Sequence, residues 1–173
     1  MPEFLNVSSV LENLQLKDSL MGAEFGCGSA MFALALAKRL SKGRVYALDI
    51  QEEKLSAVKG RAMIEKVTNI MPVVCDLEKE KGSTLHTGTV DVVLIPNLLF
   101  QVENKHAILT EAVRILKNGG QLLVIDWSKE GPGSPISGLV APETVKRIAQ
   151  EAGIVLKKEF AAGDYHYALV FTK

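Results

Sequence analysis

Short apolar runs alternate with amphipathic segments along most of this chain. Residues 21–25 are typical of a buried strand that ends at a pair of glycines, and residues 30–41 then carry apolar side chains at helical spacing. The alternation repeats as far as residue 125. Parallel strands need intervening helices as crossover connections, and such connections are right-handed. The sequence therefore predicts an α/β fold in which helices cover both faces of a mainly parallel sheet.

The remaining expected elements complete a Rossmann-like, doubly wound sheet of seven strands. Residues 161–165 form a short connection, which predicts that the last two strands make an antiparallel hairpin. A short helix is expected to open at a capping box that begins at Ser9 and to run towards Leu16. The other expected helices are residues 52–66, 106–116 and 142–153, and the further strands are residues 44–48, 70–74, 90–95, 121–125, 154–160 and 167–171.

Two of these strands carry residues that disfavour a central position in a sheet. Pro72 has no N–H to donate to a neighbouring strand. Lys157, Lys158 and Glu159 place consecutive charges on the strand near the end of the chain, as edge strands often do. We therefore expect both strands to lie at the outer edges of the sheet.

The length and composition fit one globular domain. Hydrophobic residues make up 47% of the 173 residues and charged residues 23%, values that exclude a disordered chain or a disulfide scaffold. We expect a single domain over residues 1–173, in which residues 1–20 form an N-terminal helix or lid segment. Residues 128–138, rich in Gly and Pro, are expected to be a flexible loop at the end of the sheet where ligands bind.

Charge and cysteine content restrict the partners of the chain. Lys plus Arg and Asp plus Glu both total 20, so the net positive field typical of nucleic-acid-binding proteins is missing. Cys27 and Cys75 are too few and too far apart for a zinc site or a redox pair, which indicates reduced thiols. Neither a signal peptide nor a run of 18 apolar residues is recognised. We expect a cytoplasmic protein without a metal site or membrane span.

The sharpest functional signal is E-F-G-C-G-S-A at residues 24–30, between the first strand and its helix. Glycines let the backbone approach a ligand closely, and the helix that follows offers free N–H groups. A dinucleotide fingerprint would need a third glycine where Met31 stands, and methionine is too large for the close packing that this glycine permits. Glu24 instead suits a cationic amine, held directly or through water, although it could also pair with a lysine.

Two more acids follow the next two strands. Asp49 lies 21 residues beyond Gly28, at the end of the second strand, where a carboxylate can accept both hydroxyls of a ribose. Asp76 follows the third strand, where it can accept from an exocyclic adenine amine. Each acid has a structural alternative, because Asp49 could cap the next helix and Asp76 could form an ordinary turn.

These features, with V-D-V-V-L-I-P-N-L-L at residues 90–99 and I-L-K-N-G-G-Q-L at residues 115–122, resemble the class I S-adenosylmethionine-dependent methyltransferases over nearly the whole chain. The chain is most similar to the ubiquinone/menaquinone-biosynthesis type, whose corresponding segments read N-x-L-H-H and L-K-P-G-G. It has Phe100 and Gln101 in place of the two histidines and Asn118 in place of the proline. The resemblance implies strand order 3-2-1-4-5-7-6 with strand 7 antiparallel, in agreement with the expected edges.

The resemblance also implies the cofactor, S-adenosyl-L-methionine, which leaves as S-adenosyl-L-homocysteine. Residues are assigned to it by their positions in the matching motifs. The implied cofactor-binding residues are Glu24, Gly26, Cys27 (through its backbone), Gly28, Pro96 and Asn97 at the methionyl part, Asp49 at the ribose, and Ile50, Asp76 and Leu77 at the adenine.

Methyl transfer from a sulfonium requires alignment, desolvation and, for some acceptors, a base. His166 is expected at the start of the last strand, at the same end of the sheet as the cofactor. It is our candidate base, with Tyr165 and Trp127 as walls of the acceptor site. The competing interpretation is a structural cluster at the rim of the sheet.

The sequence therefore predicts a methyltransferase that acts on a small or lipidic acceptor. A macromolecular acceptor, RNA or protein, is the first alternative, and a basic face made of Lys38, Arg39, Lys42 and Arg44 would support it. The second alternative is a non-catalytic cofactor-binding or interaction protein, which aromatic side chains filling the acceptor side would favour.

Overall fold

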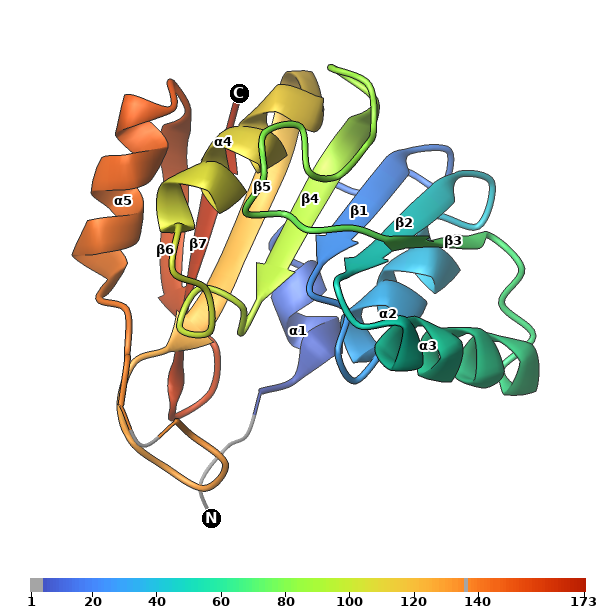
Figure 1. Cartoon of the computed structure of the whole chain (residues 1–173), viewed down its shortest axis with the longest axis horizontal. Helices are drawn as coiled ribbons and strands as arrows, with labels where there is room; N and C mark the ends of the chain where they lie inside the picture. The colour runs from blue at the N-terminus through green and yellow to red at the C-terminus, as the bar shows by residue number, and fades with distance from the viewer. Residues whose placement is uncertain (1–4, 136) are drawn as a thin grey trace.

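Twelve helices and strands follow one another in the computed structural model, which describes residues 5–135 and 137–173 (Figure 1). They are α1 (Val7–Leu11), β1 (Met21–Phe25), α2 (Met31–Arg39), β2 (Arg44–Asp49), α3 (Glu52–Ile64), β3 (Ile70–Val74), β4 (Val90–Pro96), α4 (Lys105–Ile115), β5 (Leu116–Trp127), α5 (Pro142–Glu151), β6 (Val155–Ala161) and β7 (His166–Thr172).

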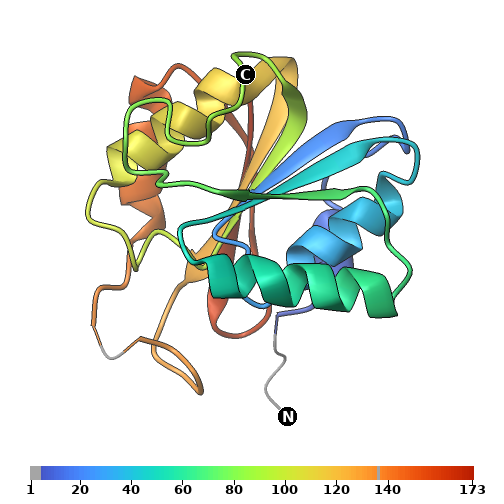
Figure 2. The same ribbon diagram turned by 45° about the vertical axis from the view of Figure 1, so that its right-hand side comes forward.

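The strands form one seven-stranded sheet in the order β3-β2-β1-β4-β5-β7-β6. β7 runs antiparallel to both of its neighbours, β5 and β6, whereas all other pairs are parallel. The predicted fold class and strand order are thus confirmed, with the Pro72 strand at one edge and the Lys157 strand at the other. Helices α1, α2 and α3 lie on one face of the sheet, and α4 and α5 lie on the other (Figures 1 and 2).

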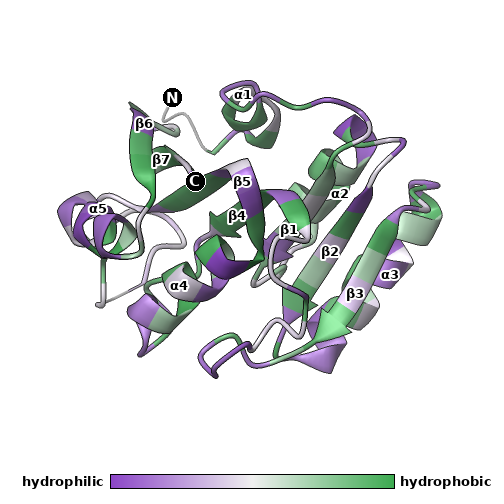
Figure 3. Cartoon of the chain, turned by 90° about the horizontal axis from the view of Figure 1, so that it is seen from above, coloured by the Kyte–Doolittle hydropathy of each residue, from purple (hydrophilic) through white to green (hydrophobic). Residues whose placement is uncertain are grey.

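Apolar side chains fill both spaces between the sheet and its helices. β4 supplies both layers, because Val93 and Ile95 point towards α4 and α5 while Val92 and Leu94 point towards α1 and α2. Such burial on both faces explains the near-continuous apolar run of this strand. Seen from above, hydrophobic residues follow the strands and α5 turns a hydrophilic side outward (Figure 3).

The start of the first helix was predicted wrongly. Asn6, not Ser9, is its N-cap, and the Asn6 side chain accepts a hydrogen bond from the Ser9 N–H at 3.1 Å. Asn and Ser are similarly good N-caps. The helix uses the earlier of the two candidates. The helix also ends at Leu11 instead of running towards Leu16.

β5 is longer than its predicted range, since it begins at Leu116 directly after α4. The residues expected only to close that helix therefore lie within the strand. Gly119 adopts a left-handed φ of 79°, and the ladder between β4 and β5 has an irregularity at Val90 and Val92. Glycine permits this local change of register at little cost.

The two segments expected near the ligand are only partly described. Residues 1–4 of the expected N-terminal lid segment lie outside the described residues, as does residue 136 of the 128–138 loop. Leu5 packs against the apolar cluster between the sheet and α1 and α2. Within the described ranges, none of the helices has the length and apolar character that crossing a membrane requires.

Candidate cofactor-binding site

The glycine turn after β1 is fixed by the neighbouring strand. The N–H groups of Gly26 and Cys27 both donate to the Leu48 carbonyl of β2, at 2.8 and 3.3 Å. Gly26 has a left-handed φ of 72°, and a Cβ atom there would lie 2.9 Å from Leu98 Cδ1. Gly26 thus gives the turn both its backbone shape and its close contact with the segment after β4.

Contrary to expectation, Met31 does not limit the packing of α2 against β1. The Met31 side chain is 45% exposed and does not separate α2 from β1. The close approach of these elements occurs instead at Gly22, where a Cβ atom would lie 2.8 Å from Leu36 Cδ2. The first turn of α2 faces solvent on the side of Met31, so the size of this residue does not limit the packing of the helix.

A cavity of about 470 Å³ opens beside the glycine turn, at the carboxyl ends of the first three strands. Six of the expected cofactor residues line it: Gly26, Gly28, Asp49, Ile50, Asp76 and Leu77. The expected Glu24, Cys27, Pro96 and Asn97 do not line it. Several further lining residues were not predicted from the sequence, namely Ser29, Gln51, Lys54, Cys75, Glu78, Leu98, Gln101, Val102 and Ile108.

Asp49 makes a structural contact while it faces the cavity. Its Oδ1 accepts the Gln51 N–H at 2.9 Å, which shapes the entry into α3. Its Oδ2 lies 3.9 Å from Cys27 Sγ. The capping role considered as an alternative is therefore present in part, and the second oxygen accepts a hydrogen bond from the Cys27 thiol beside the glycine turn.

Asp76 is likewise engaged in a turn at the wall of the cavity. Its Oδ1 accepts the Glu78 N–H at 3.1 Å, and its Oδ2 lies 3.3 Å from Lys79 Nζ. The ordinary-turn alternative for this residue is thus observed. Because Asp76 also lines the cavity, the turn presents its side chain and that of Leu77 to the same space.

Glu24 is a buried acid beneath the turn, and the Ala33 backbone N–H favours its carboxylate. It is 2% exposed, and its Oε2 has no hydrogen-bond partner among the described residues. No lysine of residues 5–135 or 137–173 forms an ion pair with it. Burial raises the pKa of Glu24 to about 8, and the charge of nearby Asp49 adds to this rise. A cation in the adjoining cavity would favour the charged carboxylate.

Glu24→Gln should remove a pH dependence of stability. The folded chain resists ionisation of Glu24, so its thermal midpoint should fall relative to that of the variant as pH rises from 4.5 to about 8. The amide keeps the volume of the side chain and carries no charge. Thermal midpoints measured without ligand at pH 5, 6.5 and 8 test this, with the exposed Glu159→Gln as control. If the difference between the two thermal midpoints stays constant across the three pH values, the pKa of Glu24 is not raised in the folded chain.

Cys27 is a packing residue in this structure. It is 1% exposed, and burial together with the charges of Glu24 and Asp49 raises the pKa of its thiol. A raised thiol pKa disfavours the reactive thiolate. The Cys27 side chain therefore packs inside the fold, and the residue does not line the cavity.

Asn97 begins a tight turn after β4, of which Leu98, Gln101 and Val102 reach the cavity. Its backbone is left-handed, with φ 51°, and its N–H donates to the Ile125 carbonyl at 2.8 Å. Gln101 Nε2 donates to the Asn97 carbonyl at 2.6 Å and closes the turn. Asn97 thus shapes this turn, and it lies behind the residues that line the cavity.

His166 opens β7 and lies against Trp127, its neighbour on β5, with ring centroids 4.1 Å apart. It is 6% exposed, its Nε2 has no partner within the described part of the chain, and burial lowers its pKa. It does not line the cavity beside the glycine turn. His106, by contrast, is exposed and lies 3.6 Å from Glu151.

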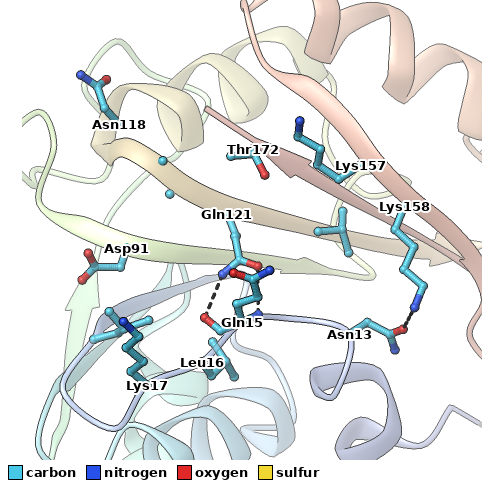
Figure 4. Close-up of a pocket in the computed structure, with 14 residues that line it drawn as sticks. Asn13, Gln15, Leu16, Lys17, Asp91, Asn118, Gln121, Lys157, Lys158 and Thr172 are labelled. Atoms are coloured by element: carbon cyan, nitrogen blue, oxygen red, sulfur yellow. Dashed lines mark hydrogen bonds between the residues drawn. The ribbon is translucent and has the colours of Figure 1, made fainter.

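A second cavity, of about 770 Å³, lies at the opposite, amino-terminal side of the sheet (Figure 4). Its polar groups are largely paired with one another. The backbone N–H of Gln15 donates to Gln121 Oε1 and Gln121 Nε2 donates to the Gln15 carbonyl, at 3.0 and 3.1 Å, while Lys158 contacts Asn13 (Figure 4). Among the described residues, the glycine turn and the strand-end acids Asp49 and Asp76 lie at the first cavity and not at this one.

Comparisons with known proteins agree with this geometry. Residues 23–124 match the family described as "Methyltransferase domain". The ubiquinone/menaquinone biosynthesis C-methyltransferase UbiE of Hydrogenovibrio crunogenus is 36% identical over 103 residues, which make up 59% of this chain and 40% of that protein. The chain thus matches less than half the length of this curated relative.

Solved structures show the same fold. A SAM-dependent methyltransferase from Aquifex aeolicus superposes with a TM-score of 0.86 at 24% identity, covering 96% of this chain and 89% of the other. The trans-methyltransferase CalH, solved as a complex with SAH, gives a TM-score of 0.77 at 17% identity, covering 90% of this chain and 52% of the other. The family match covers more than half of the sequence and includes the glycine turn and both cavity acids, and on this basis the chain belongs to the class I S-adenosylmethionine-dependent methyltransferases.

Proposed function

We propose that this chain binds S-adenosyl-L-methionine in the cavity beside the glycine turn and transfers its methyl group to a small or lipidic acceptor. The observation that supports this most is the meeting of Gly26, Asp49 and Asp76 in one cavity at three adjacent strand ends. The curated relatives are named as quinone-biosynthesis C-methyltransferases, which supports a small acceptor.

The residues present fit this cofactor. Asp49 would accept the ribose hydroxyls, while Ile50, which is 62% exposed at the cavity, would pack on the adenine. Asp76 and Leu77 would contact the adenine edge. The open space at Gly28, where a Cβ atom would meet only the Gly26 carbonyl at 3.9 Å, leaves room for a ligand against the backbone.

The methionyl end would lie over the glycine turn. Glu24 would balance the charge of its amine from beneath, directly or through water, and the Cys27 backbone would lie beside it. Pro96 and Asn97 would support this end through the turn that follows β4. A buried acid with one oxygen unpartnered among the described residues is costly to ionise without a cation, which supports this placement of the amine.

The bound cofactor supplies a methyl group that its own positive charge activates for displacement. The chain then needs to align the acceptor and exclude water. We propose that His166 accepts the acceptor's proton at Nε2, beside Trp127 and Tyr165 as walls. Because burial lowers the pKa of His166, the ring is neutral near pH 7 and able to take a proton.

The basic face considered for a macromolecular acceptor is largely neutralised. Lys38 contacts Glu65 at 2.7 Å, and Lys42 contacts Asp18 at 2.7 Å. Such pairing reduces the positive field that a nucleic acid would require. This observation favours the small acceptor over RNA.

Calorimetric titration of the full chain tests the proposed cofactor. S-adenosylmethionine and S-adenosylhomocysteine should each bind at one site, whereas NAD should not saturate the protein. A cell extract supplied with methyl-labelled cofactor should then yield a labelled small molecule in the presence of the chain. Saturation by NAD alone, or label found only on RNA or protein, would contradict the proposal.

Asp49→Ala should weaken S-adenosylhomocysteine binding by about 1–3 kcal/mol, because two ribose hydroxyls lose a charged acceptor. The same titration measures the change, and the thermal midpoint of the variant checks that it folds. Asp18→Ala is the matched control, since Asp18 is a partly exposed acid paired with Lys42 outside the cavity lining. Equal affinity of Asp49→Ala and the parent would exclude the ribose role.

A further inference from the structure

The glycine turn ends at Ala30, whose backbone is unusual for a residue with a side chain. Ala30 is the N-cap of α2 and has a left-handed φ of 65°. In this conformation a Cβ atom comes too close to the following carbonyl oxygen, so residues other than glycine seldom adopt it. Strained backbone of this kind persists only where neighbouring groups hold it, and it collects at functional sites.

Two contacts of Ala30 itself provide part of the support for this turn. The Ala30 N–H donates to the Cys27 carbonyl at 2.7 Å, which closes the turn. The Ala30 methyl group is buried and packs with apolar residues of α2, α3 and β2, but it cannot accept a hydrogen bond from the first turn of α2 as an N-cap side chain usually does. Neither contact acts on the carbonyl of the preceding residue, Ser29.

Arg61 of α3 binds that carbonyl. Its Nη1 donates to the Ser29 carbonyl oxygen at 2.7 Å. This oxygen lies in the planar peptide group between Ser29 and Ala30, and the φ of Ala30 is the rotation of this plane about the Ala30 N–Cα bond. A guanidinium bound to the oxygen therefore fixes the direction of the peptide plane and, with it, the left-handed φ.

The guanidinium of Arg61 is in turn connected to α2. Its Nη2 lies 3.5 Å from Glu65 Oε1, and Glu65 Oε2 lies 2.7 Å from Lys38 Nζ. Lys38 belongs to the last turn of α2, and α2 and α3 lie side by side on one face of the sheet (Figures 1 and 2). The ion pairs thus orient Arg61 between the two helices, with its other nitrogen directed at Ser29.

The backbone that Arg61 holds faces the cavity proposed for the cofactor. Gly28 and Ser29 line this cavity, whereas Ala30 and Arg61 do not. A rotation of the peptide group between Ser29 and Ala30 would move the backbone of both lining residues. An effect of Arg61 on a ligand in the cavity therefore has to act through the shape of the turn.

We propose that Arg61 is a positioning residue for the cofactor: by holding the Ser29 carbonyl it keeps Ala30 left-handed, and it so keeps the turn in the shape that receives the ligand. This role rests on the proposed cofactor. Without the guanidinium, the strained turn relaxes in most molecules, and the apparent affinity falls by the fraction that keeps the binding shape.

Arg61→Met tests this role, because methionine keeps an unbranched side chain and removes the donor. S-adenosylhomocysteine should bind the variant about 10-fold more weakly than the parent, as when roughly one molecule in ten keeps the turn. Calorimetric titration of the full chain measures the affinity. The Arg61 side chain is 46% exposed, so the variant should fold, and its thermal midpoint checks this. A merely structural arginine would lower the thermal midpoint and leave the affinity unchanged.

A second background separates positioning from direct contact with the ligand. Glycine adopts a left-handed φ without strain, so the turn of an Ala30→Gly chain should keep its shape without the guanidinium. Arg61→Met should therefore weaken binding by less than about twofold in this background, the limit within which independent effects add. If Arg61 touched the ligand, its loss would weaken binding equally in both backgrounds.

Lys59→Met is the matched control, because Lys59 is an exposed cation of the same helix that does not line the cavity. It should bind S-adenosylhomocysteine as the parent does. The positioning role is overturned if Arg61→Met weakens binding by less than about twofold, or by the same factor with and without Ala30→Gly. A parent that fails to bind S-adenosylhomocysteine overturns the proposed function itself.

Discussion

His166→Ala should slow methyl transfer by about 100-fold or more while leaving S-adenosylhomocysteine affinity unchanged, because it removes the group proposed to accept the acceptor's proton. Nε2 is buried and unpartnered within the described residues, and the ring lies against Trp127, so the imidazole is fixed in orientation. Transfer of a labelled methyl group to the acceptor identified from extract measures the rate, and calorimetry measures the affinity.

His106→Ala is the matched control, since His106 is exposed and pairs only with Glu151 among its described ionic contacts. It should retain the parent rate. Burial lowers the pKa of His166 below 6.5, so the parent rate should fall only on the acid side of that value, where the base becomes protonated. A loss of less than about threefold in His166→Ala would assign the ring to the structural cluster at the rim.

Arg114→Met should lower the free energy of unfolding by about 3–5 kcal/mol, because it leaves the buried Glu111 carboxylate without its cation. Arg114 holds Glu111 with two hydrogen bonds of 2.7 Å and also donates to the Leu85 carbonyl at 2.8 Å. The Glu111 side chain is only 4% exposed. Urea unfolding at pH 7 measures the change.

The pH dependence of the same variant gives a second test. Burial acts to raise the pKa of Glu111, but hydrogen bonds from Arg114 and Ser83 outweigh it and leave the pKa lowered. The stability that this pair provides is therefore present above pH 4.5 and is lost as pH falls below it. Arg147→Met, which breaks an exposed pair with Glu151, should cost less than about 1 kcal/mol. Similar losses in both variants would show that the Glu111 pair is not stabilising.

The sheet could be predicted because its signals are local. The parallel strands β1, β2, β4 and β5 are short apolar runs that are each followed by a helix. Pro72 marks β3 as an edge by a covalent property of the residue itself. The cap at Asn6 was missed because Asn6 and Ser9 offer competing caps three residues apart, and only the packing of Val10 and Leu11 selects between them.

The site residues that lie directly at or after strand ends were predicted from the sequence. Gly26, Asp49 and Asp76 were found because topology alone brings parallel strand ends together. Leu98 was missed because its place at the cavity depends on the contact between the turn after β4 and the glycine turn. No pattern within one segment reports such a contact.

Both edges of the sheet interrupt their own backbone pattern. In β3, Pro72 has no N–H to donate. In β6, the ladder with β7 shifts register between Leu156 and Lys158, where lysine side chains also project. A strand from another molecule needs an unbroken row of donors and acceptors to extend a sheet. The folded molecule is therefore a poor template for intermolecular β-pairing. Growth of fibrils from its edges is disfavoured, and no helix is needed to cover them.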